Sequence, residues 1–176
     1  MSRARARSNL VVVDTNVLLV ANKNHEKASP ECVQACARTL NEIRISGHVV
    51  VDSLQRIVTE YRNKTLRDKG QREAGDEFVL WMLTNLWNKA RCTQVGLTPT
   101  PEDEQNFEEF PRSASLASFD RSDRVFVAVA NAHPRKPPIV AACDTDYWKC
   151  RKGFSENGIT IDFLCEADVI KFAAEK

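Results

Sequence analysis

A carboxylate and an amide interrupt an apolar run near the start of the chain. In the segment VVVDTNVLL, residues 11–19, Asp14 and Asn16 stand among valines and leucines. An ionised carboxylate without a partner is costly in a dry interior. We therefore expect Asp14 to have a chemical role, and that of a metal ligand suits an acid in such a place.

Further acids stand at or near the ends of the expected elements. Asp144 closes the apolar segment PPIVAACD, Asp146 follows two positions later, and Asp123 opens an alanine-rich segment. Glu60 lies at the edge of the apolar stripe of the segment LQRIVTEYRN. If these carboxylates meet, they repel one another and raise each other's pKa, unless a divalent cation compensates them.

Mg²⁺ and Mn²⁺ are the cations that oxygen ligands favour, and Mg²⁺ keeps several waters that phosphate groups can displace. A site of this kind hydrolyses phosphodiesters by activating a water molecule and neutralising charge in the transition state. Each acid also has an ordinary structural explanation. Asp123, Asp120 and Asp146 are good helix caps, Asp144 can simply end a strand, and Glu60 can be a solvated helix residue.

The elements that must position these acids alternate along the chain. Strands are expected at 9–14, 48–53, 90–98, 137–144 and 159–164, and helices at 29–47, 54–68, 72–89, 120–133, 146–158 and 166–176. The stretch 98–118 is expected to be a loop with at most a short helix. This alternation predicts an α/β fold, a three-layer α/β/α sandwich with a central, mainly parallel sheet. Ligands of such sheets bind beyond the carboxyl ends of the strands.

Length and charge limit the function further. The 176 residues suit a single domain at 9–176 after a flexible basic N-terminus at 1–8. Lys and Arg number 25 against 24 Asp and Glu, so global charge makes no case for nucleic acid or an anionic membrane. Six basic residues near the acids either hold phosphates or form ordinary solvated helix faces: Arg62, Lys64, Arg67, Lys149, Arg151 and Lys152.

The N-terminus imitates a secretory signal, but Asp14 and Asn16 interrupt its apolar part. No apolar run reaches the roughly 18–20 residues of a membrane-spanning helix. We therefore expect a cytoplasmic protein without a membrane partner. The six cysteines contain no CxxC pair, so we expect reduced thiols rather than a zinc site or a disulfide.

Four segments taken in order, VVVDTNVLL, LQRIVTEYRN, SDRVFVAVA and AACDTDYW, resemble the PIN-domain nuclease family over residues 10–165. That family opens with a hydrophobic strand ending in Asp-Thr-Asn or Asp-Thr-Ser. It carries a Glu in an early helix, an Asp before an alanine-rich helix, and a later strand that ends in Asp. The chain departs from it in two places: Ala142-Cys143 replaces the usual Thr-Asn, and residues 96–119 form a longer insertion than in toxin-like members.

The resemblance implies a PIN-like Rossmannoid fold and a Mg²⁺- or Mn²⁺-dependent endoribonuclease acting on single-stranded or structured RNA. Its acidic quartet falls on Asp14, Glu60, Asp123 and Asp144. Asp146 matches a fifth position of the family's motifs, which is commonly acidic. Asn16 matches the polar residue that helps to orient the first Asp of the family. Toxin, RNA-processing and defence nucleases share this site, so the resemblance does not decide among these roles. It leaves open whether the protein binds an antitoxin or another protein partner, and whether it forms a homodimer.

Two alternatives also remain open. A catalytically silent PIN-like domain that binds RNA or protein would carry the same residues. A haloacid dehalogenase-like phosphatase also opens with an apolar strand and an Asp, but it needs a second Asp where this chain has Asn16.

Overall fold

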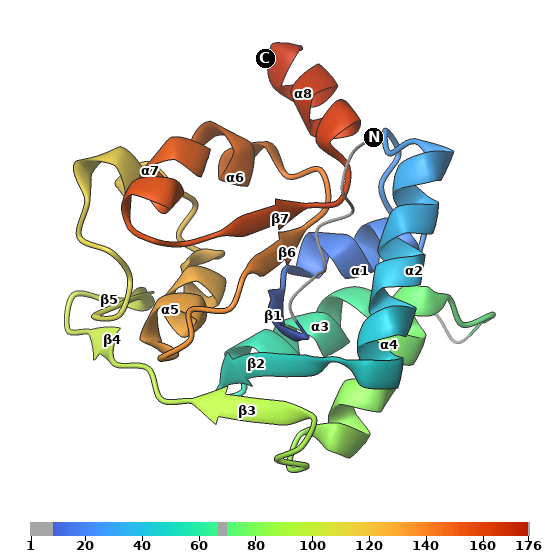
Figure 1. Ribbon diagram of the computed structural model, residues 1–176, viewed down its shortest axis with the longest axis horizontal. Helices are drawn as coiled ribbons and strands as arrows, with labels where there is room; N and C mark the ends of the chain where they lie inside the picture. The colour runs from blue at the N-terminus through green and yellow to red at the C-terminus, as the bar shows by residue number, and fades with distance from the viewer. Residues whose placement is uncertain (1–8, 67–69, 176) are drawn as a thin grey trace.

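Five parallel strands form the centre of the molecule (Figure 1). The computed structural model describes residues 9–66 and 70–175, so the expected basic N-terminus at 1–8 lies outside the described residues. The strands lie in the order β3-β2-β1-β6-β7. Their bounds are β1 Leu10–Val13, β2 His48–Asp52, β3 Cys92–Val95, β6 Ile139–Ala141 and β7 Ile161–Phe163. The expected α/β fold with a central parallel sheet flanked by helices is confirmed.

Helices cover both sides of this sheet (Figure 1). Their bounds are α1 Thr15–Ala21, α2 Pro30–Ser46, α3 Arg56–Thr65, α4 Ala74–Asn85, α5 Arg124–Ala132, α6 Thr145–Lys149, α7 Arg151–Glu156 and α8 Glu166–Ala174. Helices α1 to α4 pack against one another, while α5 packs against β1, β2 and β6, and α6 packs against α7 and α8. The strands β1 and β2 are therefore apolar on both faces, as a sheet covered on both sides requires.

Helix α2 shows how the sequence sets these boundaries. Ser29 Oγ accepts a hydrogen bond from the Cys32 backbone N–H at 3.2 Å, Pro30 occupies the first turn, and Gly47 caps the end of the helix. This start and stop agree with the expected helix. Helix α1 was not expected, because its apolar residues continue the apolar strand before it, although Asp14 caps its start.

The stretch 98–118 differs from the expected loop. It contains a small antiparallel hairpin, β4 Pro99–Thr100 and β5 Asp103–Phe107, followed by a short 3₁₀ helix, η1 Ala114–Leu116. Three aromatic and aliphatic side chains anchor the stretch in the core: Phe107, Phe110 and Leu116. Burial of these side chains stabilises a segment whose polar composition alone indicates a loop.

Two local expectations at helices are also corrected. The single helix expected at 146–158 is divided at Cys150 into α6 and α7. Asp123 is the residue that caps α5, and its side chain makes no capping hydrogen bond. Asp120 lies before this cap and instead accepts hydrogen bonds from the backbone N–H and hydroxyl of Ser122.

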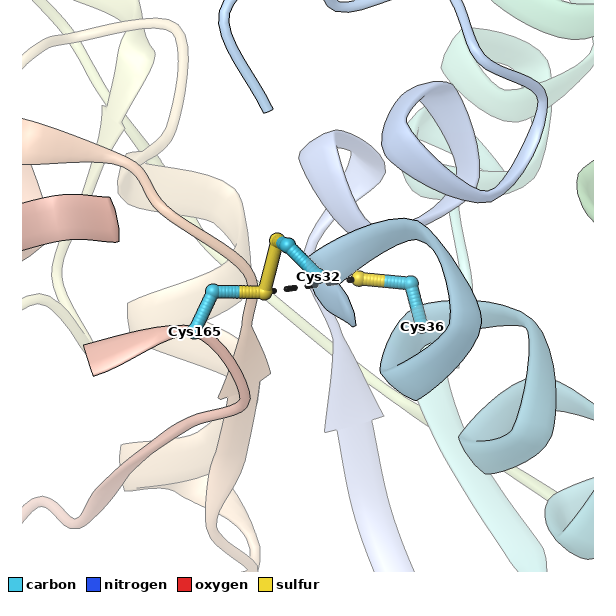
Figure 2. Close-up of side chains that lie close together, drawn as sticks. All are labelled: Cys32, Cys36 and Cys165. Atoms are coloured by element: carbon cyan, nitrogen blue, oxygen red, sulfur yellow. Dashed lines mark hydrogen bonds between the residues drawn. A yellow bond between two sulfur atoms is a disulfide. The ribbon is translucent and has the colours of Figure 1, made fainter. Parts of the chain in front are cut away.

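The expectation of six reduced thiols is wrong for two cysteines. Cys32 in α2 and Cys165 at the start of α8 form a disulfide, with Cα atoms 5.3 Å apart (Figure 2). The other four cysteines are thiols. The pairing is hidden in the sequence because 133 positions separate the two residues, and only the fold brings the start of α8 next to the start of α2.

Within the described ranges, no helix combines the length and the apolar character that crossing a lipid bilayer requires.

Candidate metal-binding acidic site

Asp14 and Asp144 follow neighbouring parallel strands at the same edge of the sheet. Val13 of β1 is paired with Val140 of β6, and the Asp14 backbone N–H donates to the Val140 carbonyl at 2.9 Å. Asp14 comes directly after β1, and Asp144 comes three residues after the end of β6. The topology therefore brings two carboxylates separated by 130 positions to one edge.

Each of these two carboxylates is fixed by the helix that it caps. Asp14 Oδ2 accepts a hydrogen bond from the Asn16 backbone N–H at 3.0 Å. Asp144 Oδ1 accepts from the backbone N–H groups of Asp146 at 2.7 Å and Tyr147 at 3.4 Å. Within the described part of the chain, Asp14 Oδ1 and Asp144 Oδ2 make no hydrogen bond. Capping thus leaves one oxygen of each carboxylate for another ligand.

Glu60 reaches the site from α3, which packs against α1. Its Oε1 accepts a hydrogen bond from Thr15 Oγ1 at 2.8 Å and another from Lys64 Nζ at 2.9 Å. Thr15 is the residue after Asp14, so this contact connects the two acidic positions through a single buried hydroxyl.

Asp123 reaches the site from the start of α5, which packs against β1 and β6. Burial and then the negative charges of Asp144 and Glu60 raise the pKa of Asp123 to about 7, while the Lys64 ammonium opposes this rise. A pKa so far above the ordinary value of an aspartate means that the protein disfavours a further negative charge at this position.

The same repulsion acts on Asp14, which is only 2% exposed. Burial, followed by the charges of Asp123, Asp144 and Glu60, holds its pKa well above the usual range, although the hydrogen bond from Asn16 opposes the effect. Burial also raises the pKa of Asp144. Carboxylates from four separate elements therefore act on one another electrostatically at one edge of the sheet.

Asp146 and Asn16 lie beside this group in less direct roles. The Asp146 carboxylate pairs with Lys149 Nζ at 3.8 Å, and its charge raises the pKa of Asp144. Asn16 orients Asp14 through its backbone N–H, whereas its side-chain oxygen lies 3.9 Å from Cys143 Sγ. The resemblance implies orientation of the first Asp by this residue, and the contact found here is made by the backbone.

Sequence reasoning missed Tyr147 and Thr15. The Tyr147 hydroxyl is buried and has no hydrogen-bond partner among the residues that the structure describes. Burial and the charges of Asp14, Asp123 and Asp144 hold its pKa well above the usual range of a tyrosine. Tyr147 stands one residue after Asp146, and Thr15 one residue after Asp14. Neither residue type indicates in the sequence that the Tyr147 hydroxyl is buried near the acids or that Thr15 donates a hydrogen bond to Glu60.

The basic residues suggested as phosphate contacts have mixed surroundings. Lys64 contacts Glu60 and Lys149 contacts Asp146, so these two lie at the site. Arg151 stacks on the Trp148 ring with its guanidinium 4.2 Å from the centroid, and Lys152 pairs with Glu156 at 3.9 Å. Arg62 lies exposed on α3, and Arg67 lies outside the described residues.

The carboxylate oxygens of this site are ligands that suit a hydrated hard cation such as Mg²⁺. Among residues 9–66 and 70–175, no three acidic residues each place a carboxylate oxygen within 4.8 Å of the others; the set that meets this spacing consists of three cysteines. Mg²⁺ commonly takes one or two protein carboxylates and keeps several waters, so wider spacing is compatible with it. Mutually repelling carboxylates, with the ammonium groups of Lys64 and Lys149 beside them, favour a divalent cation among them.

Comparisons of the chain with protein-family models, curated protein sequences and solved structures gave no match.

Proposed function

We propose that this protein is a Mg²⁺- or Mn²⁺-dependent endonuclease of the PIN-like type, which hydrolyses phosphodiester bonds in RNA. One observation carries the proposal. Asp14, Glu60, Asp123 and Asp144 come from four different elements and repel one another at the carboxyl edge of a parallel sheet. Acids placed for solubility alone have no reason to gather at one edge, where burial and mutual repulsion raise the pKa values of Asp14, Asp123 and Asp144.

The chain's own residues would hold the cation and orient its surroundings. Asp14 Oδ1 and Asp144 Oδ2, the carboxylate oxygens that do not cap a helix, would bind the cation. Hydrogen bonds from Thr15 and Lys64 hold the Glu60 carboxylate in place. A bound cation would supply an activated water molecule and neutralise charge on the phosphate group. In the metal-free protein, protonation of Asp123 relieves the same repulsion, as its pKa of about 7 indicates.

The choice of RNA rests on the resemblance, and the local charges support it only at Lys64 and Lys149, whose ammonium groups flank the acids. A cytoplasmic location and a protein partner such as an antitoxin belong to the same proposal. The phosphatase alternative is less well supported, because Asn16 places an amide rather than a second carboxylate two positions after Asp14.

Cleavage of a mixed RNA and DNA panel tests the proposal. The protein is assayed with Mg²⁺, with Mn²⁺ and with EDTA, beside Asp14→Asn and, as a matched control, Glu42→Gln on the surface of α2. We expect RNA cleavage that EDTA and Asp14→Asn abolish and Glu42→Gln leaves unchanged. Undiminished cleavage by folded Asp14→Asn protein contradicts the site. RNA binding without cleavage, unchanged by the substitution, favours the silent binding domain.

A further inference from the structure

Three cysteine sulfur atoms, none of which belongs to a residue of the acidic site, meet in the interior between α2 and the start of α8 (Figure 2). Cys32 and Cys36 lie one turn apart on α2, and Cys165 caps α8. Cys36 Sγ lies 4.0 Å from Cys165 Sγ, and all three sulfur atoms lie within 4.8 Å of one another. The three residues are 3%, 0% and 6% exposed, respectively. We call this group the cysteine triad.

We propose that the cysteine triad is a second metal site, which binds a thiophilic ion such as Zn²⁺ when the Cys32–Cys165 disulfide is reduced. The disulfide seen in the structure is then the oxidised, metal-free form of the same site. This site is independent of the acidic site and of the proposed nuclease activity.

The spacing of the sulfur atoms is that of thiolates around one ion. Two sulfurs bound tetrahedrally to one zinc ion lie about 3.8 Å apart, because each Zn–S bond is about 2.3 Å. The separation of Cys36 Sγ and Cys165 Sγ, 4.0 Å, is already close to this value. Residues four apart on a helix share one face, so Cys32 and Cys36 both turn toward Cys165.

The fold holds the triad together without the disulfide. The backbone N–H of Ser29, which caps α2, donates to Asp168 Oδ2 in the first turn of α8 at 2.7 Å. The starts of the two helices are thus joined by a hydrogen bond close to the three sulfurs. After reduction, Cys32 and Cys165 need only separate from their bonded positions, while Cys36 stays in place.

The two helix starts also favour thiolates. Cys32 is the third residue of the 17-residue helix α2, and Cys165 is the cap of α8. The positive end of a helix dipole stabilises a negative charge close to it. A metal ion neutralises most of the remaining charge, so three buried sulfurs can be deprotonated together.

The chemistry balances with an external dithiol as the reductant. The dithiol gives two electrons to the Cys32–Cys165 bond and becomes a disulfide itself, and the two protein sulfurs take up its protons as thiols. Zn²⁺ then binds Cys32, Cys36 and Cys165 and releases three protons. The chain supplies three ligands, and a water molecule or a small thiol completes the usual four.

Metal retention by the reduced protein tests this site. The purified full chain is treated with a dithiol, freed of it without oxygen, loaded with one equivalent of Zn²⁺ or Co²⁺, and desalted. We expect about one zinc per reduced chain, none at the triad of the unreduced chain, and a sulfur-to-cobalt charge-transfer band. That band is specific to thiolate ligands, so cobalt at the carboxylates does not produce it.

Variants assign the ligands. Cys36→Ser and Cys165→Ser should each lose the charge-transfer band, while Cys150→Ser, a buried cysteine outside the triad, should keep it. Cys36→Ser retains both disulfide partners, so it remains an informative variant if Cys165→Ser proves unstable, and its folding is checked by circular dichroism. A reduced wild-type protein that retains no metal overturns the proposal. A band that survives folded Cys36→Ser also overturns it.

Discussion

Thr15 Oγ1 donates a hydrogen bond of 2.8 Å to Glu60 Oε1, and this contact joins the first turn of α1 to α3. Thr15 follows Asp14 directly, so the contact relates the position of one candidate metal ligand to that of another. It spans 45 positions of sequence. The acidic site is therefore held by a specific polar contact as well as by packing.

Thr15→Val should destabilise the protein. Valine keeps the branched shape of threonine but cannot donate to Glu60, so we expect the free energy of unfolding to fall by about 1–2 kcal/mol. Urea denaturation measures the change. Thr15→Ser keeps the hydroxyl and is the control for loss of the hydrogen bond. Equal stability of Thr15→Val and wild type would show that the contact contributes nothing.

Stability without metal should fall as the pH rises from about 4 to about 7. An unfolded aspartate has a pKa of about 3.9, whereas that of folded Asp123 is about 7, because burial and the charges of Asp144 and Glu60 raise it. Between these values the folded state binds more protons, so raising the pH favours unfolding. The raised pKa of Asp14 acts in the same direction.

Thermal denaturation in EDTA from pH 4 to pH 8, with wild type beside Asp123→Asn, isolates this effect. His133, whose pKa is lowered mainly by burial, acts in the opposite direction, but it is present in both proteins and cancels in the difference. We expect the variant to gain stability relative to wild type as the pH rises through this window. A difference that does not depend on pH would contradict the raised pKa of Asp123.

Mg²⁺ or Mn²⁺ should raise the melting temperature of the wild-type protein. A ligand that binds only the folded state at 100 times its Kd adds about 2.7 kcal/mol of stability. Asp14→Asn removes a buried, repelled charge, so its metal-free melting temperature should be higher and its response to metal smaller. Equal responses of wild type and Asp14→Asn in scanning calorimetry would remove Asp14 from the site.

Two buried tyrosines offer a matched comparison. The Tyr61 hydroxyl donates to the Val13 carbonyl, whereas the Tyr147 hydroxyl has no partner within the described part of the chain, and both residues are 0% exposed. Tyr61→Phe should lower the free energy of unfolding by about 1 kcal/mol, because a buried carbonyl loses its donor. Tyr147→Phe in metal-free protein should leave stability unchanged or raise it. Equal losses in urea denaturation would contradict this difference.

The sequence predicts the sheet and most helices because their signals are local. Apolar runs such as residues 48–52 form strands, and Ser29, Pro30 and Gly47 mark the ends of α2. Helix α1 was missed because a run apolar on every side has the same composition in a buried strand and in a buried helix. The hairpin of β4 and β5 was missed because its polar strands are fixed by a few buried aromatic residues, above all Phe107.

The candidate site could be predicted in part for a topological reason. Asp14 and Asp144 follow parallel strands, and the carboxyl ends of such strands share an edge. The contact from Thr15 to Glu60 and the proximity of Cys165 to Cys32 depend on how helices pack across large separations. Residue type and spacing carry no signal for contacts of that kind.

The proposed activity requires one cation to bind among carboxylates that come from four elements. A crystal structure of the protein with Mn²⁺, with anomalous scattering recorded to locate the ion, shows whether this cation binds there. We expect an anomalous peak within about 2.6 Å of Asp14 and Asp144 oxygens, with Glu60 and Asp123 reached directly or through bound water. An ordered Mn²⁺ ion away from all four carboxylates, or no peak at Asp14 in crystals saturated with Mn²⁺, would contradict it.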